Sequence, residues 1–266
     1  MKLGYINYLN CFPLYYRMTE KSPIPGVEIV SGYPGELNEM MRKGALDMSP
    51  ISSAAYADIQ DDAVILPDFC LASVGYVRSV ILISRLPIED LDHKNVGLSR
   101  ASQTSVVLLK CLLKKYYRIA PIYQTIPPEP CLDGLDAALI IGNEAMMNLS
   151  PDAVPYVYDL GDLWFRKTGY PVVFAVFAAR KSFMEAQPEL LKAVTDSYGQ
   201  SLQCLDTERD IVIRKASEKY PDISYDIAAY FRLIKYGFTA ELKTALRFYF
   251  SLAAESGFLN AVKEII

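Results

Sequence analysis

Small polar residues follow strand-like apolar runs at four places along this chain, and a helical pattern begins after each. The four junctions lie at residues 4–10, 46–53, 96–105 and 137–143. Such a junction directs free backbone N–H groups and side-chain hydroxyls or amides to one spot, where the helix dipole favours an anion. Ligands of open α/β sheets bind beyond the carboxyl ends of the strands, so the junctions together predict a cleft for a small anion.

Several candidate ligand-binding residues have two interpretations. Asn10 precedes a helical pattern, so its side chain either caps that helix or faces a ligand. Ser52 and Ser53 open another helical pattern, where paired hydroxyls are common caps. Arg78 begins the apolar run at 78–84, and its guanidinium either binds a carboxylate through two hydrogen bonds or lies on the surface. We keep all four as candidate substrate contacts.

The segment Ser102, Gln103, Thr104 and Ser105 has the strongest anion-binding pattern of the chain. It places three hydroxyls before a long amphipathic helical pattern, whereas a plain helix cap needs one, so we predict that it contacts a ligand. The last junction ends in Gly142 and Asn143. A glycine there either lets a ligand approach closely or makes a turn.

Composition argues against several classes of function. Lys and Arg number 27 against 31 Asp and Glu, a net charge of −4, so nothing calls for nucleic acid. The single histidine, His93, lies in a polar turn and excludes a His-rich metal centre, and no P-loop, GxSxG or dinucleotide motif is found. We therefore expect no metal site, and nucleophilic catalysis and phosphoryl transfer have no support in these motifs.

The chain reads as a cytoplasmic protein without a membrane partner. The N-terminus lacks the apolar core and cleavage site of a signal peptide, and no run of about 18 apolar residues occurs. The five cysteines form no CxxC motif and fit reduced, mostly buried thiols; they are Cys11, Cys70, Cys111, Cys131 and Cys204.

Strand and helix patterns alternate through the first two-thirds of the chain, which predicts an α/β architecture. We expect strands near 2–6, 27–31, 46–49, 63–66, 95–98, 121–125 and 136–141, a clear helix at 103–118, and a helical last third. Two further β-branched runs, at 78–84 and 171–179, predict crossovers between two lobes. The expected division is lobe 1 at 1–84 and 173–266, with lobe 2 inserted at 85–172.

Taken in order, these segments resemble the chorismate dehydratases of the futalosine route to menaquinone. The resemblance runs from residue 1 to about 180. It lies in GYINYLNCFPL at 4–14, GALDMS at 44–49, Ser79-Val80, SQTS at 102–105, Ile141-Gly142, DLGDLW at 159–164 and TGYPVVFA at 168–175.

The resemblance implies a two-lobed fold like the type 2 periplasmic binding proteins, with two crossovers and a ligand cleft between the lobes. It also implies cofactor-independent conversion of chorismate into 3-[(1-carboxyvinyl)oxy]benzoate and water. The catalytic asparagine falls on Asn10, the catalytic serine on Ser79, and the hydroxyls of 102–105 would hold a substrate carboxylate. The family usually has aspartate where this chain has Asn143, whose amide keeps the size and one hydrogen-bond acceptor.

Two other functions remain open at this stage. The sister enzyme of the same pathway, 1,4-dihydroxy-6-naphthoate synthase, shares the fold but has a histidine in the segment that reads Ile141-Gly142-Asn143 here. A non-catalytic cytoplasmic binding protein or sensor for a small carboxylate would use the same cleft. The sequence indicates no oligomeric state.

Overall fold

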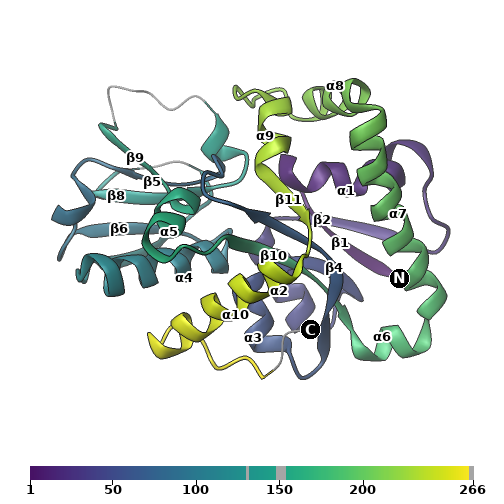
Figure 1. Ribbon diagram of the computed structural model, residues 1–266, viewed down its shortest axis with the longest axis horizontal. Helices are drawn as coiled ribbons and strands as arrows, with labels where there is room; N and C mark the ends of the chain where they lie inside the picture. The colour runs from purple at the N-terminus through teal and green to yellow at the C-terminus, as the bar shows by residue number, and fades with distance from the viewer. Residues whose placement is uncertain (130–131, 148–153, 264–266) are drawn as a thin grey trace.

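The computed structural model describes residues 1–129, 132–147 and 154–263, which form two α/β lobes side by side (Figure 1). Lobe 1 is built on a six-stranded sheet. Its strands are β1 (Lys2–Ile6), β2 (Glu28–Gly32), β3 (Met48–Ser52), β4 (Ala63–Ser73), β10 (Val172–Arg180) and β11 (Ile234–Gly237). The spatial order is β11-β4-β10-β3-β1-β2, parallel around β1 and antiparallel around β10.

Lobe 2 is built on a five-stranded sheet in the order β7-β6-β8-β5-β9. Its strands are β5 (Val80–Ser84), β6 (Asn95–Ser99), β7 (Ile122–Ile126), β8 (Ala137–Ile141) and β9 (Tyr156–Asp159). The strands expected from the sequence are all present, and β9 and β11 are additional. Strand β5 pairs with β8 and β9, so residues 80–84 belong to the second sheet and not to lobe 1 as expected.

Helices cover both sheets and make up most of the last third of the chain (Figure 1). They are α1 (Phe12–Tyr16), α2 (Pro34–Arg42), α3 (Tyr56–Ile59), α4 (Gln103–Cys111), α5 (Leu160–Thr168), α6 (Lys181–Ala186), α7 (Pro188–Thr207), α8 (Arg209–Lys219), α9 (Ile227–Leu233) and α10 (Ala240–Glu255). The helix expected at 103–118 begins as α4 and continues with π-type hydrogen bonding over Leu112–Tyr117. It ends at Arg118, whose backbone is left-handed.

The chain crosses between the lobes twice, at neighbouring positions. Strand β4 ends at Ser73, and β10 begins at Val172 directly opposite it in the antiparallel ladder. The run expected at 171–179 is thus β10 itself, a central strand of lobe 1. Both crossings lie side by side between the lobes, as a hinge requires.

Helix α10 and the segment after it contact both lobes. Tyr249 donates a hydrogen bond to the Thr104 carbonyl of lobe 2 at 3.2 Å, and it packs against the fully buried Trp164. Beyond the helix, Lys114 of lobe 2 donates to the Ser256 carbonyl at 2.9 Å and lies over the Phe258 ring.

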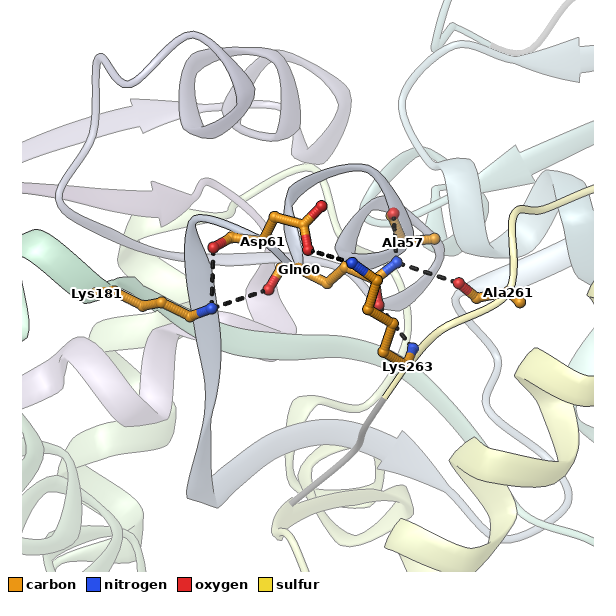
Figure 2. Close-up of polar contacts among 6 residues, drawn as sticks. All are labelled: Ala57, Gln60, Asp61, Lys181, Ala261 and Lys263. Atoms are coloured by element: carbon orange, nitrogen blue, oxygen red, sulfur yellow. Dashed lines mark hydrogen bonds and ion pairs between the residues drawn. The ribbon is translucent and has the colours of Figure 1, made fainter.

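The chain then returns to lobe 1, where Gln60 binds it on both sides (Figure 2). The Gln60 amide donates to the Ala261 carbonyl at 3.1 Å and accepts from the Lys263 N–H at 2.7 Å. The Lys263 ammonium also pairs with the exposed Asp61 carboxylate at 2.7 Å. The C-terminal segment therefore links the two lobes from the outside.

Replacing Gln60 by alanine removes both hydrogen bonds to this segment and should lower the free energy of unfolding by about 1 kcal/mol. The control is Lys263→Ala, which removes only an exposed ion pair and should change stability by less than about 0.5 kcal/mol. Urea unfolding measures both. A larger loss for Lys263→Ala than for Gln60→Ala would mean that the ion pair, not the amide, holds the segment.

The remaining composition-based expectations concern the cysteines, the histidine and the membrane. Cys11, Cys70, Cys111 and Cys204 are free, buried thiols, as expected, and Cys131 lies outside the described residues. His93 is on an exposed turn beside Asp92. Within the described residues, no helix has the length and apolar character to cross a membrane.

Candidate active site between the lobes

A narrow cavity of about 40 Å³ lies where the two lobes meet. Its apolar lining includes residues of both sheets: Ile6, Leu71, Val80, Ile141, Phe174 and Ile234. Six of the ten residues singled out from the sequence also line it: Asn10, Ser52, Ser79, Ser102, Ser105 and Gly142. The structure therefore brings all four strand-to-helix junctions to one cavity.

Asn10 lies on a short 3-10 turn, Leu9–Cys11, just before helix α1. Its side chain makes no capping hydrogen bond, so the capping interpretation of this asparagine is wrong. The Oδ1 atom is buried and has no hydrogen-bond partner among the described residues. A buried amide oxygen without a partner costs about 1–3 kcal/mol, and at a cavity wall it is a ready acceptor for a ligand.

Ser79 lies at the turn between the lobes, immediately before β5. The carboxylate of Asp159, at the end of β9, accepts hydrogen bonds from the backbone N–H groups of Val77 and Arg78, at 3.1 and 2.6 Å. These bonds hold Arg78 in a left-handed conformation with φ of 68°. Burial raises the pKa of Asp159, opposed by its backbone N–H donors. The strained turn presents the Ser79 hydroxyl to the cavity.

Tyr230, in α9, lies behind Ser79 and does not itself line the cavity, and the sequence analysis did not identify it. Its phenol donates a hydrogen bond to Ser79 Oγ at 2.7 Å across 151 positions of sequence. Tyr230 is completely buried, and burial raises its pKa well above the ordinary value. A tyrosine in a helical pattern carries no sequence signal for this role.

Side-chain hydroxyls at two helix starts each accept a hydrogen bond from a backbone N–H group of the opposite lobe. Ser52 Oγ of lobe 1 accepts from the Gln103 N–H at 3.3 Å, and Thr104 Oγ1 of lobe 2 accepts from the Ala54 N–H at 3.2 Å. Ser102 Oγ caps α4 by accepting from the Ser105 N–H at 3.2 Å. Two of the N–H groups expected to bind an anion are therefore occupied when the lobes are together.

Four predicted contacts lie off the cavity wall. Ser53 donates to the Val173 carbonyl at 2.7 Å, and Thr104 faces Ala54. The Arg78 guanidinium lies over the Tyr225 ring at 5.3 Å. These three side chains satisfy structural partners, so the hydroxyls that do line the cavity are those of Ser52, Ser79, Ser102 and Ser105.

Asn143, the fourth of these residues, joins the lobes. Its Oδ1 accepts a hydrogen bond from the backbone N–H of Leu9, beside Asn10, at 2.9 Å. An aspartate at this position would supply the same kind of acceptor. The amide therefore preserves the contact that positions the Asn10 turn.

Gly142 allows the closest approach between the lobes. Its φ is +70°, and a Cβ built on it would lie 2.2 Å from Tyr8 Cζ. Tyr8 belongs to lobe 1 and packs its ring directly over this glycine. Any side chain at 142 would collide with that ring when the lobes are together, so glycine is required for close approach.

A buried carboxyl group, Glu144, lies behind the Tyr8 ring. Its Oε1 accepts from the Tyr33 phenol at 3.3 Å, whereas Oε2 and the Tyr8 hydroxyl have no hydrogen-bond partner among the described residues. Burial raises the pKa of Glu144, the two tyrosines lower it, and Glu129 raises it further.

The Glu144→Gln variant is neutral at position 144 at every pH. Comparing its free energy of unfolding with that of the wild type should show how the Glu144 carboxyl group makes stability depend on pH. The pKa of Glu144 is raised in the folded protein. The contribution of its protonated carboxyl group to the free energy of unfolding is therefore fully present below the ordinary pKa of 4.5 and is lost as the pH rises through the folded pKa. Relative to the glutamine variant, the wild type should lose stability as the pH rises from about 4.5 toward neutrality, by about 1.4 kcal/mol for each tenfold change in proton affinity. Urea unfolding across that range measures it, and a constant difference contradicts the assignment.

No group of three or more metal-ligating side chains is found within residues 1–129, 132–147 and 154–263. The cavity instead has hydroxyls, an amide oxygen and apolar walls. Such a site holds a small polar organic molecule through hydrogen bonds and excludes water around it.

The fold defines a class of protein. The chain resembles a protein from Archaeoglobus fulgidus of known structure, with a TM-score of 0.77 and 20% identity over 97% of this chain and 98% of that one. It also resembles the alkanesulfonate-binding protein SsuA from Xanthomonas axonopodis pv. citri, with a TM-score of 0.65 and 14% identity over 98% and 94% of the two chains. The chain therefore has a two-lobed fold of the periplasmic-binding-protein type.

Sequence similarity places it more narrowly. A family model described as menaquinone biosynthesis matches residues 1–255, and the chain belongs to that family. It is 34% identical to the chorismate dehydratase of Thermus thermophilus over 195 residues, 67% of this chain and 69% of the relative. Identity to the 1,4-dihydroxy-6-naphtoate synthase of the same organism is 25% over 76% and 73% of the two chains.

Proposed function

We propose that this protein is a chorismate dehydratase, a hydro-lyase that converts chorismate into 3-[(1-carboxyvinyl)oxy]benzoate and water. The observation that carries the proposal is the meeting of Asn10 and Ser79 at one cavity wall, because these are the two residues that the family resemblance marks as catalytic. The higher identity to a chorismate dehydratase than to a 1,4-dihydroxy-6-naphtoate synthase supports it.

The reaction suits a site without a strong base. The ring proton beside the enol ether is acidified by conjugation to the ring carboxylate. That proton passes to the substrate's own enolpyruvyl carboxylate, and the C–O bond then breaks with its electron pair on oxygen. The departing hydroxide takes up the proton to give water, and the ring becomes aromatic. The enzyme contributes orientation and hydrogen bonds to the charge that develops.

The two substrate carboxylates need hydrogen-bond donors, and the cavity has hydroxyls on opposite sides. Ser102 and Ser105 lie at the start of α4 in lobe 2, and Ser52 lies across from them at the end of β3 in lobe 1. We place one carboxylate at this hydroxyl group. The macrodipole of α4 adds a favourable positive potential there.

Incubation of the purified protein with chorismate tests the proposal. Loss of chorismate with formation of the benzoate product, without added metal or cofactor, is the expected result. Tight binding of chorismate without turnover would instead identify a binding protein or sensor. Absence of both would overturn the proposal, and turnover of the sister enzyme's substrate would move the chain to that activity.

A further inference from the structure

The hydrogen bonds at Tyr230 run in one direction. The Tyr230 O–H donates to Ser79 Oγ at 2.7 Å, so the Ser79 oxygen is already an acceptor. The hydroxyl proton of Ser79 then needs an acceptor of its own. Among the described residues it has none, and Ser79 lines the cavity. The free proton of Ser79 is therefore available to a bound substrate.

Asn10 has the opposite polarity. Its Oδ1 is buried at the cavity wall without a hydrogen-bond partner among the described residues. An amide oxygen only accepts hydrogen bonds. The cavity wall therefore offers a substrate two groups of opposite polarity, the Ser79 O–H as a donor and Asn10 Oδ1 as an acceptor.

We propose that Tyr230 is a positioning residue that makes Ser79 a donor toward the leaving hydroxyl of the substrate, which in turn donates to Asn10 Oδ1. This inference rests on the proposed function. Of the polar groups of chorismate, only the hydroxyl can accept from Ser79 and donate to Asn10 at once, because the carboxylates and the ether oxygen have no proton for the Asn10 oxygen. The polarity therefore selects the leaving hydroxyl over the ring carboxylate as the group that both side chains hold.

This arrangement fits the charge that develops in the reaction. As the C–O bond breaks, negative charge grows on the leaving oxygen, and a hydrogen bond to an ionised oxygen is roughly twice as strong as a neutral one. The donation from Tyr230 polarises the Ser79 O–H and strengthens its bond to that oxygen. Tyr230 stays neutral, since burial raises its pKa, and so it orients Ser79 without giving up its own proton.

The test compares kcat and KM for chorismate in Tyr230→Phe, Ser79→Ala and the double variant, once the wild type is shown to turn over chorismate. Tyr230→Phe should lower kcat about tenfold and leave KM within about twofold, because the bond acts on the breaking C–O bond. In the double variant, loss of the Tyr230 hydroxyl should have no further effect, since Tyr230 acts through Ser79.

Tyr236→Phe is the matched control, because the Tyr236 hydroxyl is also buried but has no hydrogen-bond partner among the described residues. It should leave kcat and KM unchanged. An unchanged kcat in Tyr230→Phe, a rise in KM alone, or effects of Tyr230→Phe and Ser79→Ala that multiply would overturn the inference. A wild type that does not turn over chorismate would refute the proposed function instead.

Discussion

Replacing Ser79 by alanine should lower kcat for chorismate about 100- to 1,000-fold, the usual effect of removing one preorganised hydrogen-bond donor. The methyl group fits the space of the hydroxyl, and the turn is held by the Asp159 carboxylate, which the substitution does not touch. The protein should therefore remain folded, with a melting temperature close to that of the wild type.

Asn10→Ala tests the other half of the same wall. Removal of its amide should lower kcat to a similar extent. It should have little effect on stability, since the buried Oδ1 has no hydrogen-bond partner among the described residues to lose. Loss of turnover without loss of stability would show that the Asn10 amide serves catalysis and does not stabilise the fold.

Ser84→Ala serves as the control for both variants. Ser84 lies at the far end of β5 and is fully buried, with its Oγ 2.6 Å from the Leu86 carbonyl and 3.4 Å from the Asp136 carbonyl. Its replacement should cost stability by about 1 kcal/mol and leave kcat unchanged. Rates near that of the wild type for Ser79→Ala and Asn10→Ala would refute their assignment.

Replacing Gly142 by alanine should lower kcat/KM for chorismate about 10- to 100-fold by keeping the lobes apart. The added Cβ would lie 2.2 Å from Tyr8 Cζ, so either the Tyr8 ring moves or the lobes do not close. Overpacking of this kind costs about 1–3 kcal/mol, and here the cost falls on the closed arrangement alone. The effect should therefore appear in catalysis more than in unfolding.

Gly134→Ala separates this steric effect from backbone strain. Gly134 also has a φ of +70°, but nothing lies within 4 Å of a Cβ placed there. Both variants carry the same left-handed strain, about 1–2 kcal/mol, and should lose similar stability. Only Gly142→Ala should lose kcat/KM. Equal kcat/KM values for the two variants would show that Tyr8 does not control closure.

Close approach of the lobes also explains the capping pattern of the site. Ser52 and Thr104 each cap a helix start of the opposite lobe, and Leu9 donates to Asn143 in the same way. Opening the lobes breaks these hydrogen bonds and exposes the N–H groups to water or to a substrate carboxylate. The same junctions that line the cavity therefore also hold the lobes together, a property that the isolated junctions do not reveal.

Much of the architecture followed from local patterns. Apolar runs bounded by small polar residues predicted β1, β2, β3, β4, β6, β7 and β8, and the amphipathic pattern after Ser102 predicted α4. The short β9 and β11 were missed, because four-residue strands have too few residues for a periodicity to appear. The lobe boundary was misplaced at β5, because a fully apolar strand does not show which sheet it pairs with.

For the site, the sequence by itself determined which residues stand at the carboxyl ends of strands, since strand-to-helix junctions are local. Asn10, Ser52, Ser79, Ser102, Ser105 and Gly142 were found in this way or through the resemblance, and all line the cavity. Tertiary structure alone decided which hydroxyls face the cavity and which face a neighbouring backbone. It also added Tyr230, 151 positions from Ser79, because the direction of a buried hydrogen bond depends on partners that only folding brings together.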